Sequence, residues 1–160
     1  MSVIEGKTLE NLVPHRGKML WLSRIISCDL ERHSLVAEYD ITRQSLFFDS
    51  WYGGFPAWAS FELMAQGISA LSGMYARRRN QTPRCGFILS VSGMEAADGA
   101  LEEGAVARVE VNEETVVNNV FSFRCRVGRN EETVARAVLT VAETDDIEAL
   151  IKQREPHGQS

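Results

Sequence analysis

Glu62 is the residue whose type and surroundings most directly suggest chemistry in this sequence. It is the only charged residue from residue 55 to residue 76, in a run that otherwise consists of apolar, small and uncharged polar side chains. Because an unpaired charge is costly to bury, a carboxylate in such a run has either a structural partner or a role in proton transfer. Gln66 lies one helical turn further on and is the candidate structural partner. Both interpretations of Glu62 stay open here.

His15 is the second candidate for acid–base chemistry, since imidazole groups exchange protons near neutral pH. The alternative interpretation is an imidazole that only fixes the start of the first strand. Asp49 is a candidate second carboxylate, or a cap for the approach to the helix that follows it. His33 lies in a predicted turn and His157 in the C-terminal tail, so we expect both of these histidines to be solvated.

Residues 55–79 predict one long helix around Glu62. Pro56 suits a first helical turn, and apolar residues recur at the i, i+3, i+4 and i+7 spacing of an amphipathic helix. The opposite face carries small residues, with no Lys or Arg before Arg77, so we expect other elements to enclose this helix. The predicted apolar face consists of Phe61, Met64, Ala65, Ile68, Leu71 and Tyr75.

Strand patterns lie before and after this helix. Residues 18–27 and 35–41 are rich in apolar and β-branched residues, and residues 44–54 resemble a loop packed on the protein. Residues 85–96 predict a strand mostly buried on both sides, and three strands with apolar inner and polar outer residues follow it. The order β-β-α-β-β-β-β predicts an α+β fold, a curved antiparallel sheet wrapped around one long central helix. The three alternating strands are predicted at residues 107–112, 121–127 and 134–141.

Length and composition fit one domain with a continuous hydrophobic core. The chain has 160 residues, 44% of them hydrophobic, and we expect a single domain over residues 1–144 that begins with a short helical lead-in. A C-terminal helix and a frayed tail are expected over residues 145–160. The formal net charge of −5 argues against a general nucleic-acid binder. No apolar run reaches the roughly 20 residues of a membrane span, and the N-terminus lacks the core of a secretory signal.

The three cysteines indicate a reducing compartment. Cys28, Cys85 and Cys125 are odd in number and far apart, so they resemble neither a disulfide framework nor a zinc site. We therefore expect reduced thiols, a cytoplasmic location, and neither a metal site nor a cofactor.

Two blocks of the sequence resemble the FabZ-type β-hydroxyacyl-acyl-carrier-protein dehydratases, which have the hotdog fold. The first is LVPHRGKMLWLSRI at residues 12–25, and the second is FPAWASFELMAQG at residues 55–67. The chain is more similar still to the divergent dehydratases of aryl-polyene pathways. As topology, the resemblance covers residues 12–144. The matching positions are Pro14, His15, Gly17 and Met19 in the first block, and Pro56, Glu62, Met64, Ala65 and Gln66 in the second.

The sequence departs from the fatty-acid enzymes at one functional position. Those enzymes place a catalytic histidine in the loop before the helix, and an ungapped comparison puts Phe48 at its position here. Ser23 also replaces an Asp of the family. No histidine lies between residue 34 and the end of the predicted helix. Either His15 replaces the loop histidine from another direction, or catalysis is altered or absent.

The resemblance implies roles for several residues. A dehydratase removes water from a 3-hydroxyacyl thioester to give a trans-2-enoyl thioester, and it needs a base, an acid and donors to the thioester oxygen. We expect Glu62 to protonate the leaving hydroxyl and His15 to be the base. The backbone amides of Gly53, Gly54 and Ala57 are expected to bind the thioester oxygen, although Gly-Gly pairs are most often only turns.

The resemblance also implies an acyl tunnel and a docking patch for the substrate carrier. The tunnel residues could equally belong to the hydrophobic core, and the docking patch could be no more than a solvated helix C-terminus. The docking partner would be an acidic carrier protein with its phosphopantetheine group, or coenzyme A. The predicted tunnel comprises Phe55, Trp58, Met64 and Phe87, and the predicted patch comprises Arg77, Arg78, Arg79 and Arg84.

Two other functions fit the same resemblance. A hotdog thioesterase uses a helix carboxylate to activate water and needs no histidine. A non-catalytic subunit would bind acyl chains or stabilise an active dehydratase. In each case we expect an oligomer, either a homodimer or a complex with another hotdog protein, because hotdog domains pair their edge strands across a subunit interface.

Overall fold

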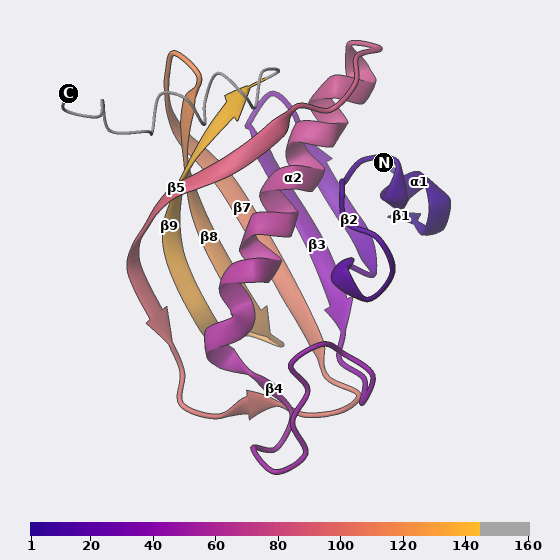
Figure 1. Cartoon of the computed structure of the whole chain (residues 1–160), viewed down its shortest axis with the longest axis vertical. Helices are drawn as coiled ribbons and strands as arrows, with labels where there is room; N and C mark the ends of the chain where they lie inside the picture. Colours follow the sequence, from indigo (N-terminus) through magenta and orange to yellow (C-terminus); the bar gives the residue numbers. More distant parts are fainter. Residues whose placement is uncertain (145–160) are drawn as a thin grey trace, which may run out of the picture.

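The computed structural model describes residues 1–144, and the C-terminal helix and tail predicted for residues 145–160 lie outside them. The chain folds into a sheet of antiparallel strands and one long helix, α2 (Figure 1). The strands are β1 (Ile4–Glu5), β2 (Arg24–Asp29), β3 (Ser34–Asp40), β4 (Phe55–Pro56), β5 (Cys85–Ala96), β6 (Ala100–Leu101), β7 (Val106–Val117), β8 (Val120–Arg129) and β9 (Glu132–Thr144). The helices are α1 (Gly6–Glu10) and α2 (Ser60–Arg78), with 3-10 turns at Gly17–Met19 and Ala57–Ala59.

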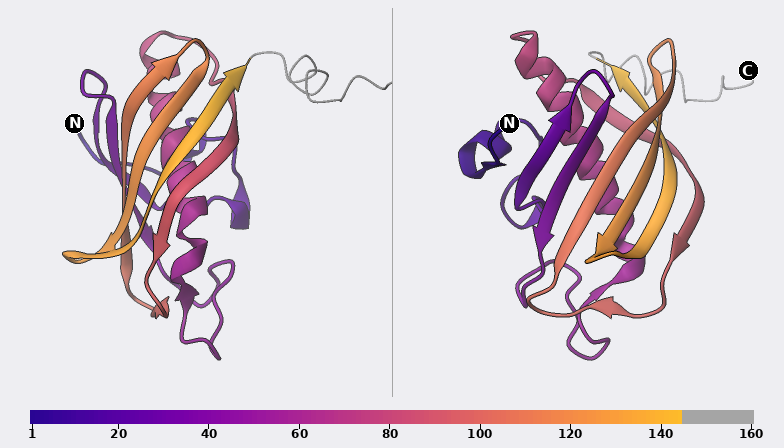
Figure 2. Two further views of the ribbon diagram at one scale, coloured as in Figure 1. Left: turned by 90° about the vertical axis from the view of Figure 1, so that its left-hand side faces the viewer. Right: turned by 180° about the vertical axis from the view of Figure 1, so that it is seen from behind.

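The main sheet has seven strands in the order β1-β2-β3-β7-β8-β9-β5, and every neighbouring pair is antiparallel. It curves around α2, as the two further views in Figure 2 show. A second, two-stranded sheet joins β4 to β6 at the start of α2. The predicted wrapping of a curved antiparallel sheet around a central helix is therefore confirmed.

Small residues let α2 lie close to its neighbours on two sides. A Cβ atom added at Gly67 would stand 3.0 Å from Val111 Cγ1 and 3.2 Å from Val109 Cγ1, both on β7. A Cβ atom at Gly73 would stand 2.1 Å from the backbone oxygen of Leu12. The sheet and residues 12–22, which we call the lead-in segment, thus cover the helix on two sides. The predicted enclosure is only partial, because Phe61 is 39% exposed and Glu62 faces a cavity.

The helix buries a different face from the one predicted by apolar spacing alone. Phe61 is 39% exposed, whereas Leu63, Gly67 and Ala70 are buried. The prediction was wrong at Phe61 because close packing against the sheet selects small side chains, and these were counted as the opposite face. Met64, Ile68 and Leu71 are buried as predicted.

Two strand predictions also needed correction. The strand predicted from residue 18 begins only at Arg24, since the lead-in segment forms a 3-10 turn and then contacts α2. β5, predicted to be buried on both sides, is an edge strand that pairs only with β9 within residues 1–144. Its apolar side chains are consequently partly exposed to solvent: Leu89 is 39% exposed and Val91 is 42% exposed.

Cys28 and Cys125 are free thiols. Burial, with a smaller contribution from Asp29, raises the pKa of Cys28 to about 11, and burial raises the pKa of Cys125 to about 12. Both thiols therefore stay protonated at neutral pH and are poor nucleophiles.

None of the helices within residues 1–144 combines the length and the apolar character that a membrane crossing requires. In the same residues, no group of three or more His, Cys, Asp or Glu side chains is placed to hold a metal ion.

Candidate functional site

The site forms where the lead-in segment crosses the first half of α2. Gly17, with a φ of +58°, allows the sharp 3-10 turn that folds the segment back onto the helix. His15 precedes this turn, and Glu62 stands in the first turn of α2. The turn therefore brings together two residues that are far apart in the sequence.

His15 and Glu62 form a pair within one chain. The Nε2 atom of His15 lies 3.5 Å from Oε1 of Glu62, and the two side chains are 23% and 24% exposed. The structure thus places the two predicted acid–base residues side by side. Because a carboxylate oxygen only accepts hydrogen bonds, Nε2 must carry the hydrogen of this contact.

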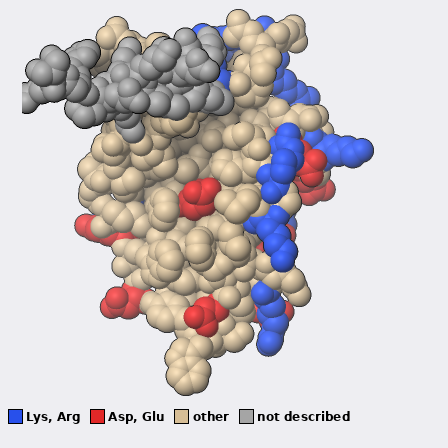
Figure 3. All heavy atoms as spheres, viewed as in Figure 1, with Lys and Arg blue, Asp and Glu red and all other residues tan. Residues whose placement is uncertain are grey.

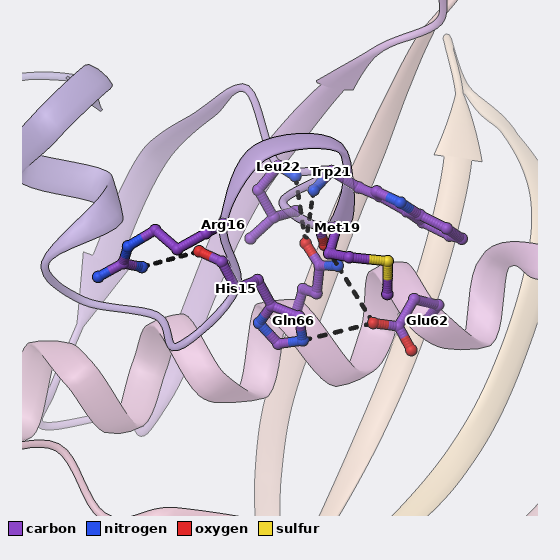
Figure 4. A network of polar contacts seen from close by, with 7 residues as sticks. All are labelled: His15, Arg16, Met19, Trp21, Leu22, Glu62 and Gln66. Carbon is purple, nitrogen blue, oxygen red and sulfur yellow. Dashed lines mark hydrogen bonds and ion pairs between the residues drawn. The ribbon is translucent and has the colours of Figure 1, made fainter. Parts of the chain in front are cut away.

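Gln66 connects the same carboxylate to the backbone of the lead-in segment (Figure 4). Its Nε2 donates to Oε1 of Glu62 at 3.1 Å and to the carbonyl of Met19 at 2.8 Å. Its Oε1 accepts from the backbone amide of Trp21 at 2.8 Å and, more weakly, from that of Leu22 at 3.4 Å. The structural partner suspected for Glu62 is therefore present together with His15.

The surroundings of Glu62 favour its charged form. Burial opposes ionisation, but the hydrogen bonds from His15 and Gln66 and the attraction of His15 outweigh it and lower the pKa of Glu62. Glu62 is thus a carboxylate at neutral pH. The Nδ1 atom of His15 is buried and has no hydrogen-bond partner within the described residues, so Nε2 is the nitrogen that acts on Glu62.

The pair opens onto a cavity of about 540 Å³, which we call the Glu62 cavity. It lies between α2, the lead-in segment and β5, and its apolar wall includes Ile68 and Phe87. Of the four predicted tunnel residues, Phe87 lines this cavity, whereas Phe55 and Met64 lie in the hydrophobic core. Trp58 is 52% exposed and lines a different, shallow hollow beside Phe47.

The amides expected to bind the thioester oxygen already have partners. Gly53 and Gly54 donate their backbone N–H groups to the carbonyl of Asp49 at 3.0 and 2.9 Å, and Ala57 donates to the carbonyl of Gly99 at 3.1 Å. The Asp49 side chain accepts from the backbone amide of Trp51 at 2.8 Å. Asp49 therefore closes a turn within this loop and does not cap α2, whose N-cap residue is Ala59, and the three amides are engaged within the chain.

The arginines of the predicted docking patch separate into two groups. Arg79 and Arg84 line a second cavity of about 280 Å³ near the end of α2, and Arg84 also lines the Glu62 cavity. Arg77 lies toward the N-terminal segment, where it lines hollows with Thr8. Lys and Arg side chains gather along one side of the face in Figure 3. Only part of the predicted patch thus borders the site.

His33, expected to be solvated, belongs to a polar cluster that the sequence did not reveal. The Tyr75 hydroxyl donates to the carbonyl of Leu30 at 3.0 Å and accepts from Nδ1 of His33. Glu113 Oε1 lies 3.8 Å from the same nitrogen, and burial followed by the charge of Glu113 raises the pKa of Tyr75 to about 12. A histidine in a predicted turn gave no signal of these contacts, which join that turn to Tyr75 of α2 and Glu113 of β7.

Comparison with solved structures places the chain among hotdog proteins. The dehydratase heterocomplex ApeI:P from Xenorhabdus doucetiae matches with a TM-score of 0.77 at 18% identity, over 92% of this chain and 97% of that one. A hypothetical thioesterase with coenzyme A from Streptococcus pneumoniae matches with a TM-score of 0.57 at 15% identity, over 75% and 84%. At these identities the likeness concerns the fold, and it confirms the expected hotdog fold.

Curated relatives match one part of the chain. The 3-hydroxyacyl-[acyl-carrier-protein] dehydratase FabZ of Chlamydia abortus is 35% identical over 75 residues, which are 45% of this chain and 49% of that protein. FabZ of Chlamydia caviae is 33% identical over the same shares. The match therefore spans about half the length of these relatives.

A family model covers most of the chain. The model described as ApeP dehydratase, of the ApeP-like family, matches residues 7–152. This range includes the lead-in segment with His15 and all of α2 with Glu62 and Gln66. The chain belongs to the ApeP-like dehydratase family.

Proposed function

We propose that this protein is a 3-hydroxyacyl-[acyl-carrier-protein] dehydratase, which eliminates water from a 3-hydroxyacyl thioester to give a trans-2-enoyl thioester. The observation that carries the proposal is the contact of His15 Nε2 with Glu62 Oε1 beside a partly apolar cavity of about 540 Å³. Membership of a dehydratase family supports the same reaction. The apolar wall of the cavity can accommodate an acyl chain. The pair of His15 and Glu62 lies where the substrate carbons that lose the proton and the hydroxyl would be bound.

The charge state of Glu62 favours a different assignment of the acid and base roles from the one expected from the sequence. A carboxylate whose pKa is lowered is a proton acceptor at neutral pH and a poor resting proton donor. Glu62 therefore takes the α-proton of the substrate on Oε2, the oxygen that accepts neither the Gln66 nor the His15 contact. The electron pair of the broken C–H bond forms the double bond, and the C–O bond at the third carbon breaks.

The leaving hydroxyl takes up the proton held by Glu62 and departs as water, so the carboxylate is restored for the next turnover. His15 keeps its hydrogen on Nε2 and steadies the carboxylate while its charge changes. This route accounts for the absence of a histidine from the loop before α2, because a single carboxylate handles both proton transfers. The N-terminal end of α2, where Glu62 stands, favours negative charge developing on the thioester.

The substrate carrier is an acyl carrier protein in an aryl-polyene or fatty-acid-like pathway of the cytoplasm. Arg79 and Arg84 border the second cavity, where they supply positive charge to an acidic carrier and its phosphopantetheine phosphate. The free thiols of Cys28 and Cys125 are consistent with a reducing compartment.

The working assembly is a complex of this chain with a second hotdog subunit, for which a homodimer is the alternative. Among residues 1–144, β5 pairs on one side only, with β9. A strand edge that is unpaired in this part of the chain and carries exposed apolar side chains is suited to pairing with another strand. The likeness to one chain of the ApeI:P heterocomplex supports a different hotdog protein as that partner. In the complex, the partner would close the Glu62 cavity along Phe87 and Ile88 of β5.

A thioesterase is the second candidate function, because an ionised helix carboxylate beside an acyl cavity can also activate water. The reaction products separate the two. The purified protein, alone and with its hotdog partner, is incubated with a 3-hydroxyacyl carrier protein. Enoyl thioester without free thiol supports the dehydratase, and free carrier thiol without enoyl product supports the thioesterase. A chain that is inactive alone and only raises the activity of its partner would be a non-catalytic subunit.

A further inference from the structure

Gln66 uses the full hydrogen-bonding capacity of its side chain. The two hydrogens on Nε2 go to the Met19 carbonyl at 2.8 Å and to Glu62 Oε1 at 3.1 Å. The oxygen Oε1 accepts from the backbone amides of Trp21 and Leu22 at 2.8 and 3.4 Å. A primary amide has two donor and two acceptor positions, and here each position is used.

These partners fix the direction in which the amide points. If the oxygen and nitrogen of Gln66 exchanged places, the NH₂ group would face two backbone N–H donors, and the oxygen would face a carbonyl and a carboxylate. The side chain is 0% exposed, so water could not compensate for such contacts. The lead-in segment therefore forces a donor toward Glu62.

The consequence for Glu62 is that its two oxygens are no longer equivalent. Oε1 receives Gln66 from within α2 and His15 from the lead-in segment. Oε2 has no hydrogen bond to another residue within the described part of the chain, and in Figure 4 it points away from both of these side chains. The carboxylate is thereby held in one orientation, with a single oxygen left for a substrate.

We propose that Gln66 is a positioning residue. Together with His15 it holds Oε1 of Glu62, and it thereby presents Oε2 to the substrate. The three backbone groups of Met19, Trp21 and Leu22 give this residue a second effect. They tie the segment that carries His15 to the helix that carries Glu62, so the supporting imidazole keeps a fixed distance from the carboxylate. The inference rests on the proposed dehydratase function.

Three other titratable or charged groups also face the Glu62 cavity, and a substitution at Gln66 does not change them. His15 faces Glu62 from the lead-in segment, Arg84 lines the cavity from the stretch before β5, and Glu143 lines it from β9. Replacing Gln66 with an uncharged residue removes one donor to Glu62 and leaves these three groups unaltered. A change in the titration of Glu62 in such a variant then reports the lost hydrogen bond.

Gln66→Met is the most informative substitution, because it removes both donors without adding a charge. Gln66→Glu is the second variant. Its carboxyl group can still accept from the amides of Trp21 and Leu22, but a second carboxyl group beside Glu62 raises the pKa of Glu62 by itself, so the uncharged variant isolates the lost hydrogen bond. Ser23→Ala is the matched control, because its hydroxyl accepts from the Asp40 amide at 2.9 Å next to the lead-in segment and does not touch Glu62.

The first readout is the titration of the Glu62 carboxyl by ¹³C NMR, with Glu62→Gln used to assign its signal. Both Gln66 variants should move the midpoint of Glu62 to higher pH, whereas Ser23→Ala should leave it where it is in the wild type. This measurement needs no substrate. An unchanged midpoint in folded Gln66→Met would overturn the inference, and a shift in Gln66→Glu alone would report only the added charge.

The second readout is steady-state kinetics on a 3-hydroxyacyl thioester, in the presence of the hotdog partner. Loss of orientation should lower kcat by about 10- to 100-fold with little change in KM, and the acid limb of the kcat/KM profile should follow the NMR midpoint. A kcat loss no larger than that of Ser23→Ala would contradict the positioning role. If the wild type forms no enoyl product at all, the proposed function fails, and the NMR titration still decides the role of Gln66.

Discussion

At the scale of single residues, Glu62 is held by two donors that reach the same oxygen from different elements. His15 approaches from the lead-in segment and Gln66 from one turn further along α2. Together they outweigh the burial that opposes ionisation and lower the pKa of Glu62. A fixed carboxylate with one oxygen free can accept a proton and return it, which is what a one-carboxylate elimination of water needs.

The lowered pKa gives folding stability a defined dependence on pH. The ordinary pKa of a glutamate is taken as 4.5, and that of folded Glu62 lies below it. The stabilisation by the ionised carboxylate is therefore fully present above the ordinary value and is lost as the pH falls through the lowered value. The free energy of unfolding should differ most between wild type and Glu62→Gln near pH 7, and the difference should shrink toward pH 3.

Urea unfolding of both proteins at several pH values measures this difference. Glu31→Gln is a suitable control, since Glu31 lies in the exposed turn between β2 and β3. A difference between wild type and Glu62→Gln that stays constant from pH 7 to pH 3 would show that Glu62 has the same pKa in the folded and unfolded protein.

At the scale of elements, α2 is positioned by glycines as much as by its apolar residues. The Gly67 contact is with valine methyl groups, which can yield, whereas the Gly73 contact is with the backbone of Leu12. The second contact is the less adaptable, and it holds the segment that leads to His15.

Gly73→Ala and Gly67→Ala form a matched pair of substitutions on one helix. Without new contacts, each would stabilise the helix by about 1 kcal/mol. We expect Gly67→Ala to change stability by less than about 1 kcal/mol, and Gly73→Ala to destabilise the protein by roughly 1–3 kcal/mol through overpacking. Gly73→Ala should also lower dehydratase activity, because Leu12 and then His15 must move. Thermal unfolding with activity assays tests both effects, and equal behaviour of the two variants would contradict this account.

Much of this arrangement could be predicted from periodicity, and the failures have physical causes. The alternation of apolar residues in β7, β8 and β9 marked antiparallel strands with one buried face. It could not show that β5 is an edge strand, because an apolar run looks the same whether another strand or a second subunit covers it. Residues 18–23 match a strand pattern for a similar reason, since the apolar residues of the lead-in segment are buried without joining the sheet, which begins here at Arg24.

Part of the arrangement around Glu62 could be predicted from the sequence. Glu62 stood out as a lone charge in an apolar run, Gln66 as its possible partner one helical turn further on, and His15 as an imidazole in a block that resembles the dehydratases. Which atoms meet, and hence which group carries the proton, depends on the turn at Gly17 and on the backbone groups that orient Gln66. The cluster of His33, Tyr75 and Glu113 was missed because its members come from three elements with no shared spacing.

At the scale of the whole molecule, the exposed edge of β5 and the cavity beside it belong to one surface. Phe87 and Ile88 line the cavity, while Val91 further along the strand is 42% exposed. A second hotdog subunit that pairs with β5 would cover the apolar side chains and close the cavity in one step.

Val91→Arg should therefore abolish the association of this chain with the proposed hotdog partner while leaving the fold intact. A charged side chain on a strand edge disfavours pairing with another strand. Val117→Arg is the control, because Val117 is 67% exposed at the far end of β7. Light scattering coupled to size exclusion measures the mass of each mixture. An unchanged complex with Val91→Arg would rule out the β5 edge as the interface.

The central claim, that the Glu62 carboxylate carries both proton transfers with His15 as its support, is tested most directly by the rate of enoyl-thioester formation in three proteins. Wild type, Glu62→Gln and His15→Ala are each assayed with the hotdog partner and a 3-hydroxyacyl carrier protein. The account predicts that Glu62→Gln loses about 10²- to 10⁴-fold in rate, and that His15→Ala loses less and keeps measurable turnover. Full activity of Glu62→Gln, or a His15→Ala loss as large as that of Glu62→Gln, would contradict it.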